Sequence, residues 1–173
     1  GLNYGSYGMG SQPHIWVEML KQQSKGNLTH VAYKGGAPAV QDLMAGHIDM
    51  MLDVAPSSIP LVREGKVKAL VVVGSSRRLP QVPQVPTITE LGMPQLDIPG
   101  WTGVVTRRGT PEPILNRLHD AVVKAVQSPD VVQRYTDLGL EIAPSSRDEF
   151  ERLIQSETTR WGDVIRAAGV KLE

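Results

Sequence analysis

The rest of the chain is organised around one glycine-rich stretch, Gly5-Ser6-Tyr7-Gly8-Met9-Gly10-Ser11-Gln12-Pro13-His14. Its three glycines allow sharp backbone bends. The following residues have helical periodicity, with Ser11 as a good N-cap and Pro13 suited to a first turn. A glycine-rich loop that opens a helix presents unpaired N–H groups at the positive end of the helix dipole. The stretch therefore predicts an anion site, with a ligand-free strand-to-helix turn as the alternative.

The loop does not match three familiar motifs. Its glycines follow the order G-x-x-G-x-G rather than the G-x-G-x-x-G of dinucleotide-binding folds, and no Gly-Lys-Ser/Thr follows. Ser11 does not lie in the G-x-S-x-G of a nucleophile elbow. These differences disfavour a dinucleotide, a nucleoside triphosphate and an α/β-hydrolase nucleophile.

The composition excludes several classes of function. The 173 residues carry 18 basic and 18 acidic side chains, so the sequence has no charge signature for nucleic acid or an anionic membrane. It has no cysteine, which excludes disulfides and cysteine-based metal sites. No signal peptide is recognisable at Gly1, and the chain begins almost directly in a predicted strand. We therefore expect a mature or truncated form.

The first part of the chain alternates predicted strands and helices with short loops. This pattern is typical of an α/β fold with a parallel sheet. The predicted strands are Leu2–Gly5, Leu28–Tyr33, Ile48–Leu52 and Lys68–Val73.

The composition changes after Val73. Residues 74–100 contain five prolines and predict a stiff connector lying across a surface. After it we expect strands at Trp101–Thr106 and Leu140–Ala143. We also expect helices capped by Thr110, Ser128 and Ser146, the last with a capping box completed by Glu149. We therefore predict two units, residues 1–100 including the connector and residues 101–173.

Polar or glycine-rich turns follow three successive predicted strands. In an open parallel sheet, ligands collect beyond the carboxyl ends of the strands. Ser6, Tyr33-Lys34-Gly35-Gly36 and Asp53 would meet at this edge and form a small-molecule site. Each also has an ordinary structural interpretation: Asp53 as a helix cap, Lys34 as a surface lysine and His14 as a structural histidine.

Catalysis and metal binding have weaker support. Ser6 or Ser11 with His14 and Asp53 would supply the residue types of a nucleophilic triad, but the elbow motif is missing. The four histidines are scattered without metal-ligand spacing. We expect no metal, no cofactor and no nucleic-acid partner.

Several stretches, in order and nearly throughout the chain, resemble the Bug-type extracytoplasmic solute receptors of tripartite tricarboxylate transporters. They are Tyr4–Ser11 with His14 and Glu18, Val31–Ala39, Gly46–Asp53, Gly65–Leu70, Val85–Ile88, Trp101–Gly103, Gly109–Pro111, Arg160–Gly162 and Ala168–Lys171.

The resemblance implies a periplasmic binding protein, type II-like, in which two α/β lobes close on a small carboxylated ligand. The ligand would be a dicarboxylate, tricarboxylate, amino acid or aromatic acid, delivered to membrane transporter subunits without catalysis. On this sequence the implied ligand-binding residues are Ser6, Tyr7, Gly8, Gly10, Ser11, His14, Tyr33, Lys34, Gly35, Gly36, Asp53, Val54 and Ala55.

Members of this family are nearly twice as long. The resemblance therefore implies an N-terminally truncated receptor whose signal peptide lies outside this chain. Residues 1–100 would form most of lobe two, and residues 101–173 the returning part of lobe one. Two alternatives stay open: a Ser/His hydrolase-like enzyme, and a ligand-free fragment that self-associates through its uncovered faces.

Overall fold

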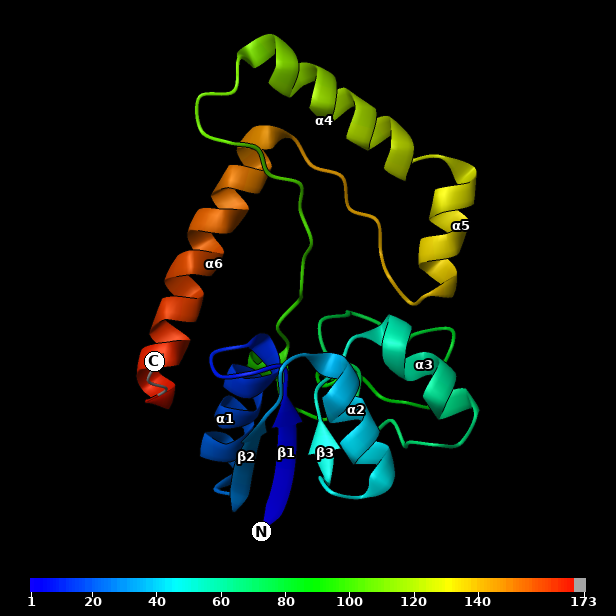
Figure 1. Cartoon of the computed structure of the whole chain (residues 1–173), viewed down its shortest axis with the longest axis vertical. Coiled ribbons are helices and arrows are strands. Elements are labelled where there is room, and N and C mark those ends of the chain that lie inside the picture. The colour runs from blue at the N-terminus through cyan, green and yellow to red at the C-terminus, as the bar shows by residue number, and fades with distance from the viewer. Residues whose placement is uncertain (170–173) are drawn as a thin grey trace.

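The computed structural model describes residues 1–169, and it begins with a parallel sheet (Figure 1). The strands are β1 (Leu2–Ser6), β2 (Leu28–Ala32) and β3 (Met50–Met51), in the order β2-β1-β3. β1 pairs with β2 along its whole length, with Tyr4 opposite His30, and with β3 at Tyr4 and Gly5. The predicted α/β class with a parallel sheet is confirmed.

Three helices follow the three strands: α1 (Gln12–Ser24), α2 (Gly36–Ala45) and α3 (Ala55–Arg63). Ser11 is the N-cap of α1 as predicted, but its hydroxyl donates to the Gly8 carbonyl at 2.7 Å instead of capping the helix. The C-cap of α1 is Lys25, which adopts a left-handed conformation with φ of 53°. Because all three strands run the same way, the N-termini of these helices lie at one edge of the sheet.

The connector contributes core residues, which the sequence analysis did not anticipate. Ile88, Leu96 and Ile98 are buried with Tyr4 and Trp16 in one cluster. A short 3₁₀ helix, η1 (Pro94–Leu96), presents its Leu96 carbonyl to the Trp16 indole N–H at 2.8 Å. The connector is therefore packed into the sheet domain, because its alternating proline and apolar residues allow an extended chain to bury side chains.

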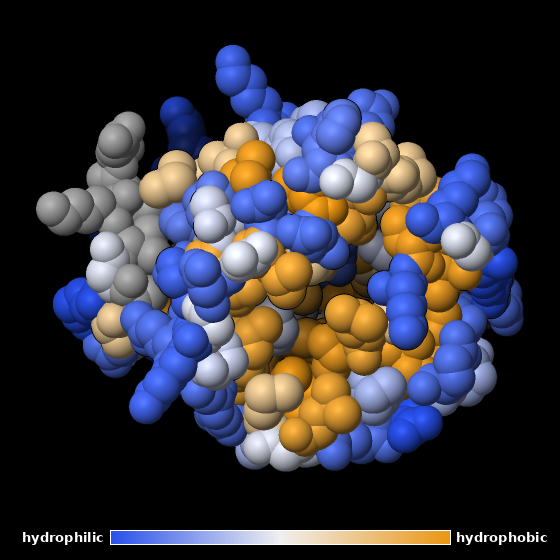
Figure 2. Space-filling model, turned by 90° about the horizontal axis from the view of Figure 1, so that it is seen from below, coloured by the Kyte–Doolittle hydropathy of each residue, from blue (hydrophilic) through white to orange (hydrophobic). Residues whose placement is uncertain are grey.

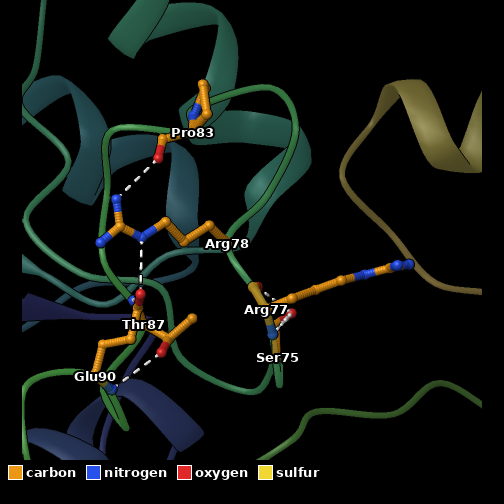
Figure 3. A network of polar contacts seen from close by, with 6 residues as sticks. All are labelled: Ser75, Arg77, Arg78, Pro83, Thr87 and Glu90. Atoms are coloured by element: carbon orange, nitrogen blue, oxygen red, sulfur yellow. Dashed lines mark hydrogen bonds and ion pairs between the residues drawn. The ribbon is translucent and has the colours of Figure 1, made fainter.

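The connector is also held by polar contacts, shown close up in Figure 3. The Arg78 Nε donates to both carboxylate oxygens of Glu90 at 3.0 Å, and its Nη1 donates to the Pro83 carbonyl at 3.2 Å. Glu90 also accepts from the Thr87 N–H at 2.7 Å. Arg78 lowers the pKa of the Glu90 carboxyl, with the Thr87 N–H as the second cause.

Two predicted strands of the first part are shorter than expected or absent. Ile48–Leu52 contributes only Met50 and Met51 to the sheet. Lys68–Val73 forms no strand: Val72 makes one isolated bridge to Thr87, and Leu70 is exposed. An open groove of about 690 Å³ runs beside this segment, lined by Val62, Gly65, Lys66, Val67, Lys68, Ala69, Leu70, Gln84, Val85 and Pro86. A β-branched run becomes a strand only where a neighbour pairs with its backbone.

Residues 101–169 extend away from the sheet and return to it (Figure 1). The helices are α4 (Glu112–Val126), α5 (Pro129–Asp137) and α6 (Arg147–Ala168), and α6 packs against α1. The predicted capping box of Ser146 and Glu149 is present at α6, whereas Pro111 rather than Thr110 caps α4. The strands predicted at Trp101–Thr106 and Leu140–Ala143 are absent from the structure of these residues.

Large apolar side chains remain exposed in this second part. α4 and α5 bury none of their residues. On the face seen from below Figure 1, apolar residues surround a central hollow (Figure 2). Within residues 1–169, no helix has the length and apolar character needed to cross a membrane. The division at residue 100 remains a prediction.

Candidate functional site

A cavity of about 550 Å³ lies where β1 and β3 end and where α2 and α3 begin. Its lining combines four residues predicted from the sequence with four that were not: Tyr7, Gly36, Asp53 and Val54, and Ala37, Val40, Gln41 and Ser57. Most of the lining is apolar, and no lysine or arginine of the described residues belongs to it. The cavity thus occupies the sheet edge at which the sequence analysis placed a small-molecule site.

Asp53 is the acceptor around which one wall of the cavity is built. Its carboxylate accepts hydrogen bonds from the hydroxyls of Tyr7, Ser57 and Ser58, the last at 2.6 Å. Burial, followed by the bond to Asp53, raises the pKa of Tyr7, so this phenol is a neutral donor at physiological pH. The arrangement satisfies the Asp53 charge with hydroxyl donors of the protein. A contribution of Asp53 to ligand binding remains a prediction.

The glycine loop, Tyr7–Ser11, uses several of its N–H groups internally. The Gly8 N–H donates to the Ser6 hydroxyl at 3.1 Å, the Gly10 N–H to His14 Nδ1 at 3.0 Å, and the Ser11 N–H to the Gly8 carbonyl at 3.2 Å. These three donors are therefore not directed at a ligand, contrary to the anion site expected on this loop. Tyr7 is the residue of the loop that lines the cavity.

His14 and His30 form a stacked pair beneath the loop. Their ring centroids are 3.9 Å apart with an interplanar angle of 4°. The Ser6 hydroxyl lies 2.6 Å from His30 Nε2, and Ser6 and His14 are buried. Burial lowers the pKa of both rings, and for His30, where the His14 ring is the second cause, to about 4.

The expected combination of Ser6 or Ser11 with His14 and Asp53 is not assembled. Ser6 contacts His30, His14 accepts from a backbone N–H, and Asp53 accepts from Tyr7 and two serines. The sequence analysis does not predict His30 as a partner, because its place opposite Tyr4 depends on the register in which β2 pairs with β1. No cluster of three or more potential metal-ligating side chains occurs in the described part of the chain.

The turn after β2 contributes mainly its glycines. The Tyr33 hydroxyl donates to Asp42 at 2.7 Å, and Lys34 is exposed, so neither belongs to the cavity lining. Gly35 has a positive φ of 108°. A Cβ on Gly36 would lie 3.1 Å from the Tyr7 ring, so glycine permits the close approach of α2 to that ring. Ala55 begins α3 at the cavity edge without lining it.

The chain matches the family model described as "Tripartite tricarboxylate transporter family receptor" (TctC) over residues 1–170. It is 38% identical over 165 residues to the "UPF0065 protein in tcbD-tcbE intergenic region" of Pseudomonas sp. strain P51, covering 95% of this chain and 49% of that protein. MatC of Rhodopseudomonas palustris, solved with bound malate, is 41% identical with a TM-score of 0.84, covering 95% of this chain and 56% of the other.

An R. palustris protein solved with adipate is 32% identical with a TM-score of 0.89, covering 98% of this chain and 56% of the other. The chain therefore spans about half the length of these relatives. With the family model matched over nearly all its residues, this chain belongs to the tripartite tricarboxylate transporter receptor family, the Bug-type receptors that its motifs resemble.

Proposed function

We propose that this chain forms the carboxylate-binding lobe of a periplasmic solute receptor that delivers its ligand to a tripartite tricarboxylate-type transporter. The observation that carries this proposal is the cavity at the N-termini of α2 and α3. Helix N-termini offer unpaired N–H groups and a positive dipole end, which favour a carboxylate. Because Asp53 already accepts from three hydroxyls, its charge is partly compensated before a ligand arrives.

The lining also favours a particular kind of carboxylic acid. Ala37, Val40 and Val54 present apolar surface, and among residues 1–169 no cationic side chain lines the cavity to neutralise further negative charges. A short hydrocarbon acid with one carboxylate at this lobe matches this chemistry better than a compact trianion. The malate and adipate of the two solved relatives support ligands of this size.

Binding without turnover is the second part of the proposal. The hydrolase alternative needs a serine activated by a histidine that a carboxylate orients. Ser6 is buried and lies 2.6 Å from the His30 ring, whereas Asp53 accepts from hydroxyl groups. These contacts disfavour nucleophilic catalysis and support a receptor.

Amide chemical shifts of the 173-residue chain would test the proposal. We expect malate and adipate to shift the Gly36, Ala37 and Ala55 amides, with millimolar affinity because one lobe leaves the ligand partly in water. Malamide, in which neutral amides replace both carboxylates, is the control and should leave these signals unchanged. Equal shifts with malamide, or no shift at these amides with either acid, would contradict a carboxylate site here.

A further inference from the structure

The glycine loop is attached to the sheet through the two stacked imidazoles. Gly10 is held by His14 Nδ1, and Gly8 is held by the Ser6 hydroxyl, which in turn contacts His30 Nε2. Tyr7 lies between Ser6 and Gly8, and its hydroxyl reaches Asp53 in the cavity wall. The histidine pair thus sits at the base of the segment that places Tyr7.

The hydrogen bond to Gly10 requires a specific protonation state. A backbone N–H can only donate, so His14 Nδ1 must carry a lone pair and its ring must be neutral. A proton on Nδ1 would place two donors against each other and remove the attachment of Gly10. Protonation of both His14 and His30 would place two positive rings in contact, because their centroids are only 3.9 Å apart.

The charged groups around the two rings differ in whether they favour or oppose protonation of the pair. Glu18 favours a positive charge on both rings, but it already accepts from the Tyr4 hydroxyl at 2.7 Å and lies 3.5 Å from the Lys21 ammonium. Lys21 disfavours protonation of both rings, and the Tyr4 ring stacks on His30 with centroids 5.0 Å apart. Burial also favours the neutral forms, since the pKa of each ring is lowered chiefly by desolvation.

We propose that His14 and His30 are positioning residues that hold the glycine loop, and through it Tyr7, in the ligand-binding arrangement only while both imidazoles are neutral. The consequence for ligand binding rests on the proposed function, whereas the release of the loop does not. Acidification would therefore free the loop before the sheet unfolds and would weaken carboxylate binding at the adjoining cavity.

The loop itself provides a readout without ligand. Between pH 7 and 4 we expect the exchange protection of the Gly10 amide, corrected for intrinsic rates, to fall about three- to tenfold, the size of one lost hydrogen bond. Amides of β1 should keep their protection over this range. The His14 ring signals should titrate with the same midpoint as the Gly10 amide.

Two variants separate this role from a merely structural one. His14→Asn supplies an uncharged acceptor near the position of Nδ1, so Gly10 should remain protected at pH 4 while the fold is kept. His47→Gln is the matched control, because His47 lies exposed beyond α2 with Asp42 as its partner, and it should show the wild-type pH profile. A Gly10 amide in His14→Asn that loses protection on acidification as much as in the wild type would overturn the proposal.

The wild-type chain alone also decides the matter if His14→Asn does not fold. Separate midpoints for the His14 ring and the Gly10 amide, or loss of Gly10 protection together with β1, would refute the proposal. Failure of malate to shift the Gly36 amide would contradict the proposed function and leave the loop experiment unaffected. If both proposals hold, the malate-induced shift should diminish on acidification in the wild type more than in His14→Asn.

Discussion

The Tyr7 hydroxyl donates a hydrogen bond to the Asp53 carboxylate, and this bond joins the ends of β1 and β3 across the cavity. The two residues are 46 positions apart in the sequence. Tyr7 follows β1 and Asp53 comes just after β3. Because these two strands are parallel neighbours in the sheet, their ends bring the two residues together.

Replacing Tyr7 by phenylalanine should remove this bond and keep the ring. Hydrogen bonds to a charged group contribute about 1.5–3 kcal/mol, but Ser57 and Ser58 would still serve Asp53, so we expect a loss of about 1–2 kcal/mol in the free energy of unfolding. Urea denaturation would measure it. Tyr135→Phe, at a partly exposed position on α5, is the control, and equal losses in both variants would show that the Asp53 bond contributes nothing.

Sequence patterns predict the structure correctly where the conformation depends on neighbouring residues. The capping box at Ser146 and the opening of α1 at Ser11 depend on residues within one helical turn, and both are found in the structure. Asp53 was placed at a sheet edge because a strand precedes it. In these cases the neighbouring residues alone determine the conformation.

Features that depend on distant partners were missed. Lys68–Val73 has strong β propensity, but its backbone makes one isolated bridge, from Val72 to Thr87, so its strand does not form. His30 became part of the loop attachment because β2 pairs with β1 in one particular register, and Gln41 reached the cavity because of the way α2 is rotated on the sheet. Single-sequence reasoning does not supply register or helix rotation.

Trp16 should stabilise the contact between α1 and the connector. It is buried, and its indole N–H donates to the Leu96 carbonyl. Trp16→Phe would leave that carbonyl unpaired and open a small void, so we expect a loss of about 2–4 kcal/mol in the free energy of unfolding. Trp101→Phe, at a half-exposed position, is the control for calorimetric melting. A melting temperature equal to that of the control would indicate that α1 and η1 do not depend on this bond.

Stability should fall between about pH 6.5 and pH 4 because of His30. Its pKa in the folded protein is about 4, below the ordinary value of 6.5, so the unfolded chain binds more protons in this range. The stabilisation from the neutral ring is therefore complete above pH 6.5 and is lost as the pH falls to 4. We expect on the order of 1–2 kcal/mol, allowing for solvent screening of a half-buried ring.

Protonation of carboxylates also lowers the stability at acid pH. The difference between the wild type and a His30 variant therefore isolates the contribution of His30 to the free energy of unfolding. Denaturation midpoints of His30→Gln should depend less steeply on pH between 6.5 and 4 than those of the wild type, because glutamine does not titrate. His47→Gln, which replaces an exposed histidine, is the control for the substitution itself. Parallel curves for His30→Gln and wild type would mean that His30 binds protons equally in the folded and unfolded states.

Gly139 should be sensitive to substitution because it holds the end of α5 against α3. Its φ is +73°, and a Cβ there would lie 2.7 Å from Ile59 Cδ1. Gly109 has a similar φ of +83° with open space around it, so Gly109→Ala carries only the backbone strain of about 1–2 kcal/mol. We expect Gly139→Ala to lose more stability than this control in urea denaturation. Equal losses would show that Ile59 moves aside without cost.

The last prediction concerns α4, whose apolar stripe of Ile114, Leu118 and Val122 is 36–50% exposed. A second copy of this chain could cover the stripe, so we expect concentration-dependent association in sedimentation velocity. Leu118→Lys would remove about 1.5–3 kcal/mol of burial and add a charge, weakening the dimer at least about tenfold. Asn116→Lys introduces the same side chain on the helix away from the stripe and should leave association unchanged. A chain that stays monomeric at high concentration, or equal effects of both lysines, would exclude this face as the contact between copies.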